Sequence, residues 1–202
     1  MDTPRIRTAI LIGSAVLVVS SGFLPQTHGE QVYAQTLGQK EEFTAVAIAN
    51  NNIQSGAGTV LISIDRWSTT AERDRFVATL QTKGPKALVD ALQDTRPVGR
   101  IRTPDSLGYD LRYAFQTPGE DGGRRIVIAT DRPIGFWEAY DRPRTVDYPF
   151  TIVQMQIGAD DRGTGTLSEF TKVLASGDNI FLENFASAPI MLTDIRAKKD
   201  EG

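Results

Sequence analysis

The strongest constraint in the 202-residue sequence is an alternation of apolar and polar residues along short runs. In Thr59–Trp67, for example, the apolar residues Val60, Ile62 and Ile64 occupy every second position. A period of two places each set on its own face of a strand. Turns rich in Gly, Pro, Asn and Asp separate about nine such runs. The sequence therefore predicts an antiparallel β-sandwich or a partly closed barrel.

One stretch, residues 69–92, has a helical period instead. Thr69 and Glu72 fit a capping box, in which each side chain accepts a hydrogen bond from a backbone N–H at the helix start. Gly84 suits the end of a first helix and Pro85 the beginning of a second. Apolar residues recur on one face: Phe76, Val77, Leu80. We therefore expect a mainly β, α+β fold with one helix pair packed on the sheet.

A second alternating run follows the predicted helices. Tyr109, Leu111, Tyr113 and Phe115 alternate with polar or small residues. The simplest interpretation is one continuous strand with all four of these side chains on one face.

The beginning of the chain has the features of a signal peptide. Arg5 and Arg7 precede the apolar run Ala9–Val19, and small residues allow cleavage after Ala34, or earlier near Gly22. The run is shorter than the roughly 20 residues that a membrane-spanning helix needs. We therefore expect the leader to be removed rather than kept as an anchor.

These features predict the domain organisation. Residues 1–34 are expected to be a signal peptide and residues 35–202 a single β-rich globular domain. A short flexible end would precede the first strand, which we expect to begin at Phe43. The mature protein would be secreted or periplasmic, with no stable membrane anchor after cleavage.

Two missing residue types exclude several functions. The chain has no cysteine, and its one histidine, His28, lies in the expected leader. The mature protein would have no disulfide and no material for a Ser-His-Asp triad, a thiol nucleophile or a conventional zinc site, so we expect no metal and no cofactor. The net charge is −3 without any basic block, so nucleic acid is not an expected partner.

Five charged residues fall on neighbouring predicted strands: Arg100, Arg102, Asp110, Arg112 and Arg124. Opposite charges paired across strands explain them simply. An anion-binding site on an arginine-rich sheet face is the alternative.

The segment from Asp131 to Tyr148 interrupts the strand pattern with three proline steps. It concentrates aromatic and arginine side chains, the usual anchors of binding sites. We predict a ligand site formed by Arg132, Trp137, Glu138, Tyr140, Arg142 and Arg144. The alternative is a long connection whose aromatic residues fill the end of the core.

Without histidine, a hydrolase would depend on two carboxylates across a cleft. Four residues are candidates: Glu138, Asp141, Asp147 and Glu183. We expect Glu183 to be a surface or edge residue instead. The favoured interpretation is a secreted or periplasmic, non-enzymatic binding or interaction module for an envelope or extracellular ligand, a protein or a carbohydrate. A metal-independent hydrolase of envelope polysaccharide and a structural envelope component remain the alternatives.

Four segments occur in an order that resembles a set of exported bacterial proteins of unknown function: RWSTTAERDRF, IRTPDSLGYDLRYA, GGRRIVIATDRPIGFWEA and DYPFTIV. The resemblance covers most of the expected mature chain. It implies secretion and a shared fold, and it assigns no activity and no functional residues.

Overall fold

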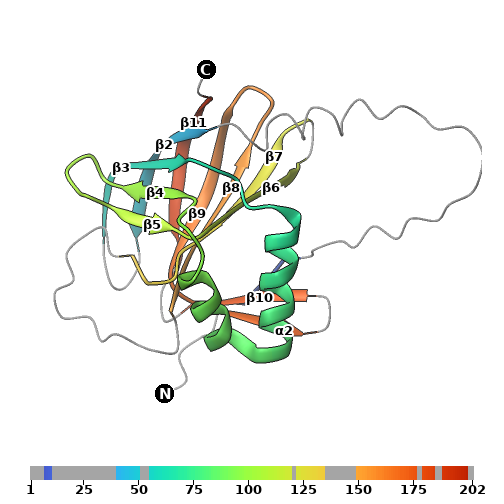
Figure 1. Cartoon of the computed structure of the whole chain (residues 1–202). Coiled ribbons are helices and arrows are strands. Elements are labelled where there is room, and N and C mark those ends of the chain that lie inside the picture. Colours follow the sequence, from blue (N-terminus) through green and yellow to red (C-terminus); the bar gives the residue numbers. More distant parts are fainter. Residues whose placement is uncertain are drawn as a thin grey trace, which may run out of the picture.

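The computed structural model describes residues 7–10, 40–50, 55–119, 122–134, 149–176, 179–184 and 188–199. Its elements in chain order are β1 (Arg7–Ile10), β2 (Glu41–Asn50), β3 (Ser55–Ile64), α2 (Thr70–Gln93), β4 (Gly99–Arg102), β5 (Tyr109–Leu111), β6 (Tyr113–Pro118), β7 (Arg124–Ala129), β8 (Phe150–Ile157), β9 (Arg162–Ser176), β10 (Asn179–Asn184) and β11 (Ile190–Lys199). These described residues are thus mostly β, with one helical element among them (Figure 1).

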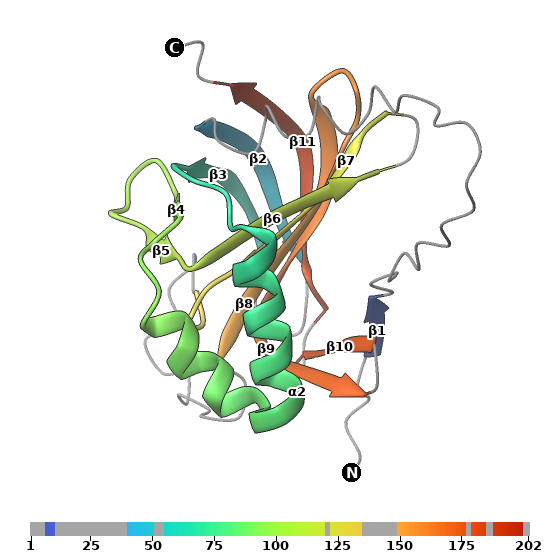
Figure 2. The same ribbon diagram turned by 45° about the vertical axis from the view of Figure 1, so that its right-hand side comes forward.

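The strands form one antiparallel sheet in the order β5-β4-β3-β2-β11-β9-β8-β7-β6, and β10 pairs with β9 and β1. The two ends of this path, β5 and β6, follow each other in the chain with only Arg112 between them. The N–H of Arg112 donates to the carbonyl of Ala129, at 3.0 Å. The sheet therefore curls into a nearly closed, barrel-like form (Figures 1 and 2).

The bend at Arg112 corrects the prediction of one continuous strand. Leu111 and Ala114 are both fully buried in the barrel interior, whereas Tyr113 packs on the outer face against α2. Because side chains alternate along a strand, a break of one residue moves every later side chain to the opposite face. Tyr113 and Phe115 therefore do not share a face with Leu111.

Side chains fill the interior of the barrel. In β2 every second residue is buried and the others are exposed, as the alternation predicts. The interior cluster also takes residues from all the strands of the main path. Its largest fully buried members include Phe43, Ile62, Ile64, Ile101, Leu111, Ile126, Ile128, Met155, Ile157 and Leu167. The interior is therefore a packed core, as is usual for a small barrel.

The helical element α2 packs on the outside of the sheet (Figure 2). Its buried residues are Phe76, Leu80, Leu88 and Leu92. They form a second apolar cluster with Ala129, Phe150, Ile152, Val173 and Leu182. The predicted burial of Phe76 and Leu80 is confirmed. Where two helices were predicted, the structure has one element with non-helical angles at Gly84 (φ 80°, ψ −176°), followed by Pro85.

The capping box at the start of α2 is confirmed. The backbone N–H of Glu72 donates to Thr69 Oγ1 at 3.1 Å, and the N–H of Thr69 donates to Glu72 Oε2 at 2.8 Å. Arg66 Nη1 donates to the same carboxylate oxygen at 3.1 Å. Burial acts to raise the pKa of Glu72, but the hydrogen bonds from Arg66 and Thr69 outweigh it, so this pKa is lowered from its usual 4.5.

Glu72→Gln is expected to reduce the free energy of unfolding by about 0.5–1 kcal/mol at pH 7. Glutamine keeps the capping geometry but removes the negative charge. A carboxyl whose pKa is lowered by folding stabilises the protein above its unfolded pKa, and that contribution is lost as the pH falls through the folded pKa. Urea unfolding from pH 7 down to pH 3 should therefore show the two proteins converging. A constant difference would mean that the charge has no part in the effect, and Asp74→Asn, which removes a more exposed carboxylate, serves as control.

Candidate functional site

Arg132 is the one residue of the predicted ligand site that falls within the described part of the chain. The other five lie outside the described residues: Trp137, Glu138, Tyr140, Arg142 and Arg144. The described part of the site is therefore the group of residues around Arg132, where β7 ends and the predicted binding segment begins.

Asp131 is the centre of this group. Its side chain is 1% exposed and lies between two arginines. Arg112 Nε is 3.6 Å from Asp131 Oδ2. Arg132 donates from Nε to Oδ1 and from Nη2 to Oδ2, both at 3.4 Å. The Arg132 side chain itself is 58% exposed. A buried carboxylate thus holds an exposed guanidinium at the surface.

Threonine hydroxyls fix the backbone on either side of this group. Thr130 Oγ1 donates to the carbonyl of Arg132 and accepts from the N–H of Thr151 at 3.2 Å. Thr151 Oγ1 in turn accepts from the N–H of Ile134 at 2.8 Å. Both threonines are fully buried. The start of the predicted binding segment is therefore tied to β8 by hydrogen bonds that water does not reach.

Arg112 connects the same group to the end of α2. Its Nη1 donates to the carbonyl of Thr95 at 2.9 Å, and Thr95 Oγ1 accepts from Arg75 Nη2 at 3.3 Å. Asp131 carries one negative charge and faces two positive ones, so the three residues Arg112, Asp131 and Arg132 together carry one net positive charge. Because a guanidinium has five N–H donors, Arg132 can bind an anionic group while Asp131 holds it.

The arginine-rich sheet face is not formed. Arg100 and Asp110 are direct partners across β4 and β5, and Arg100 Nη2 donates to Asp110 Oδ1 at 3.2 Å. This pair confirms the simple prediction of opposite charges matched across strands. Arg112 instead reaches Asp131, and Arg124 is buried at the end of the barrel. The five charged residues therefore do not share one surface.

The sequence pattern did not predict the buried ion pair between Arg124 and Glu41 at that end of the barrel. Arg124 forms two hydrogen bonds to the carboxylate of Glu41, one of them from Nη1 at 2.8 Å. Arg124 Nη1 also donates to Gln116 Oε1 at 3.1 Å, and the guanidinium lies 5.7 Å from the centre of the Phe43 ring. The side chains of Glu41 and Arg124 are 1% and 9% exposed. This group closes the barrel core and is not open to a ligand.

Of the four candidate catalytic carboxylates, only Glu183 is described; Glu138, Asp141 and Asp147 lie outside the described residues. Glu183 is buried in the full chain, on a strand that pairs with β9 on one side and with β1 on the other, so its prediction as a surface or edge residue is wrong for the full chain. Because β1 lies within the expected leader, β10 would have one open edge once the leader is removed. The residue spacing in β10 gave no sign that β1 would pair with it.

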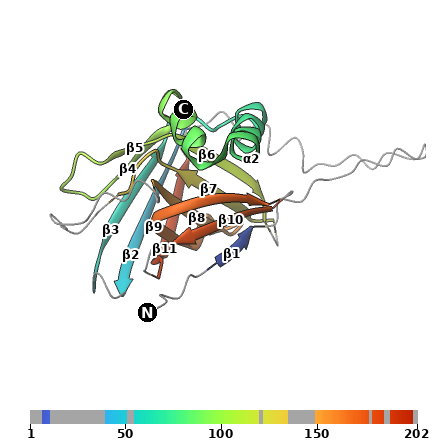
Figure 3. The same ribbon diagram turned by 90° about the horizontal axis from the view of Figure 1, so that it is seen from below.

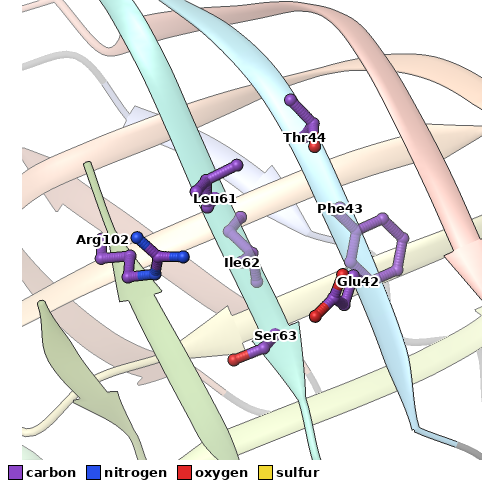
Figure 4. A pocket seen from close by; sticks show the side chains of 7 residues that line it. All are labelled: Glu42, Phe43, Thr44, Leu61, Ile62, Ser63 and Arg102. Carbon is purple, nitrogen blue, oxygen red and sulfur yellow. The ribbon is translucent and has the colours of Figure 1, made fainter. Parts of the chain in front are cut away.

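A hollow on the outer face of the sheet lies away from this site. Glu42 of β2 and Arg102 of β4 lie on its opposite sides, with Leu61 and Ser63 of β3 between them (Figure 4). Arg132, the described residue of the predicted ligand site, is not among the residues that line it.

Comparisons with protein-family models, with curated proteins and with solved structures found no match to this chain. Within the described residues, no helix is both long and apolar enough to cross a membrane. The same part of the chain contains no group of three or more His, Cys, Asp or Glu side chains placed to hold a metal ion.

Proposed function

We propose that this chain is an exported, non-enzymatic binding module that takes an anionic group of an envelope or extracellular ligand, a carbohydrate or a protein, at Arg132. The observation that supports the proposal is the fixed position of the Arg132 guanidinium. Asp131 is buried and neutralised by Arg112, and it engages two nitrogens of an arginine whose side chain is 58% exposed.

A side chain that is held before binding loses less entropy when the ligand arrives. Arginine is otherwise flexible, so an exposed arginine without such support is a weak anchor. Here the support comes from a carboxylate that water does not reach, and the backbone on both sides is tied to β8. The remaining residues of the proposed site follow within the same segment of sequence. Trp137 and Tyr140 would stack on a sugar ring, and Arg142 and Arg144 would contact the anionic group.

Arg132→Ala is expected to weaken binding to an acidic polysaccharide about tenfold, because it removes one charge-assisted hydrogen-bonding group. Polygalacturonate and dextran sulfate are suitable probes, with neutral dextran as the reference. Binding should be measured by isothermal titration at 50 mM and 300 mM salt, and it should weaken as the salt is raised. Circular dichroism checks that the variant is folded.

Arg196→Ala is the matched control. Arg196 is also an exposed arginine held by a nearby aspartate, with Nη2 3.2 Å from Asp194 Oδ2, but it lies on β11. An equal loss in both variants would show that binding follows net charge and not the Arg132 site. Trp137→Ala combined with Arg144→Ala tests the rest of the segment in the same assay. Release of new reducing ends from polygalacturonate would favour the hydrolase over a binding module.

A further inference from the structure

One edge of β3 is only partly paired. Along its whole length, Ser55–Ile64, β3 pairs with β2, but β4 pairs only with Leu61–Ile64. Figure 3 shows the β4–β5 hairpin beside one end of β3. In the ranges that the structure describes, no strand pairs with the second edge of residues 55–60.

The direction of the backbone groups at this edge follows from the pairing with β4. The N–H of Asp65 donates to the carbonyl of Val98 at 2.9 Å, so residue 65 points its backbone groups toward the β4 side. In an antiparallel ladder, every second residue points its N–H and C=O toward the same neighbour. Ser55, Ala57 and Thr59 therefore each direct both groups to the open edge.

In the part of the chain that the structure describes, the open edge has none of the lysines, prolines, inward charges, bulges or covering elements that normally prevent pairing with another chain. Natural edge strands carry lysine, proline, inward charges or bulges, or they are covered by another element. Here Ser55, Ala57 and Thr59 are small, uncharged and exposed, and they alternate with Gly56 and Gly58. Register between β2 and β3 runs without a shift from Ile64 to Ser55, so the edge contains no bulge.

We propose that a second copy of this chain pairs with this edge, antiparallel and around a twofold axis at Ala57. In that register Ala57 lies opposite its own counterpart, and Ser55 lies opposite Thr59 of the other copy. Residues that face each other in a hydrogen-bonded antiparallel pair exchange both backbone bonds. All of the N–H and C=O groups that these three residues direct outward then gain partners.

The geometry favours a second copy as the occupant. The axis at Ala57 matches side chains on the same face of both strands, whereas a register shifted by one residue would match opposite faces. β4 occupies this edge of β3 from the pairing of Leu61 with Arg102 onward, so only a short partner strand fits beside residues 55–60. The second copy offers an open strand edge of the same length. Such an interface is self-complementary, as a twofold dimer requires. It is also small, so the association is weak and depends on concentration.

The absence of cysteine allows a direct test by cross-linking. Opposite residues in a hydrogen-bonded pair have Cα atoms about 5.5 Å apart, within the range that a disulfide spans. Ala57→Cys should therefore form a disulfide-linked dimer under mild oxidation, visible on a non-reducing gel. Thr44→Cys is the matched control, because Thr44 is exposed on β2 but is paired with Leu61 of β3 and Arg196 of β11. The Thr44→Cys variant should form no disulfide-linked dimer on the same gel.

Sedimentation equilibrium over a concentration series provides the second measurement. The chain should show a monomer–dimer equilibrium, and Ala57→Lys should weaken it at least tenfold because two like charges would face each other at the axis. Thr44→Lys adds the same charge away from the edge and should leave the equilibrium unchanged. The proposal is overturned if the chain is monomeric at all concentrations, if both cysteine variants cross-link equally, or if a dimer forms that Ala57→Lys does not weaken.

Discussion

Glu41→Gln is expected to lower the free energy of unfolding by about 3–5 kcal/mol, because it breaks a buried ion pair and leaves one charge uncompensated. The Arg124 guanidinium would remain buried at the end of the barrel without its carboxylate. Asp161 Oδ1 is 3.5 Å from Arg124 Nη2, but that side chain is 43% exposed, and water screens much of its attraction. Urea unfolding at pH 7 gives the measurement.

Two comparisons separate burial from charge in this result. Asp110→Asn breaks the exposed pair with Arg100 and should cost at most about 1 kcal/mol. Replacing both Glu41 and Arg124 by leucine removes both charges, and this double variant should recover much of the stability lost by Glu41→Gln. If Glu41→Gln and Asp110→Asn cost the same, the end of the barrel is wetter than its packing indicates.

Local patterns predicted the elements of this fold well. The alternation from Val60 to Ile64 gave the strand β3 and its buried face, because side-chain direction in a strand depends only on position along it. The pairing of Thr69 with Glu72 predicted the start of α2, since a capping box is formed by residues only three positions apart. The barrel-like curl of the sheet depends instead on how its two ends meet.

That meeting point is a single residue. Arg112 separates β5 from β6, and the sequence around it alternates as though one strand continued. The bend has no proline or glycine to mark it. It follows from contacts far along the chain, such as the hydrogen bond from Arg112 to Ala129 and the ion pair with Asp131. Periodicity cannot report such contacts, so it assigned Tyr113 to the wrong face.

Contacts between residues far apart in the sequence also explain why local patterns missed or misplaced several buried residues. Glu41 belongs to the alternation of β2 and lies on its inward side, but a charged residue two positions before Phe43 was interpreted as part of a flexible end. Its partner Arg124 is remote in sequence, so nothing local predicted a buried pair. Trp67, which follows β3, is buried, and among the described residues its indole N–H has no hydrogen-bond partner, a feature that no local pattern indicates.

The binding segment shows a different limit. Composition placed the candidate site between Asp131 and Tyr148, and Arg132 is the part that the structure describes. The role of Asp131 as a buried support for Arg132 was not predicted, because burial depends on the strands packed around it. An Asp-Arg dipeptide before a proline is typical of a turn, and the sequence offered no reason to separate the two side chains into one buried and one exposed.

Leu80→Ala is expected to lower the free energy of unfolding by about 2–5 kcal/mol. Leu80 is 4% exposed and belongs to the cluster between α2 and the outer face of the sheet. Truncation to alanine removes apolar contacts and leaves a cavity that rigid strands on the other side cannot easily fill. Lys83→Ala on the exposed side of α2 should change the free energy by no more than about 0.5 kcal/mol.

Arg73, another charged residue of α2, would be a poorer control than Lys83. Its guanidinium lies 5.5 Å from the centre of the Phe115 ring, so Arg73→Ala would also remove a contact with the outer face of β6. An intermediate loss for Arg73→Ala, between those of Lys83→Ala and Leu80→Ala, would show that α2 is held by its polar rim as well as by its apolar face. Equal losses for Leu80→Ala and Lys83→Ala would instead mean that α2 contributes little packing, and that the barrel interior alone accounts for the stability of the fold.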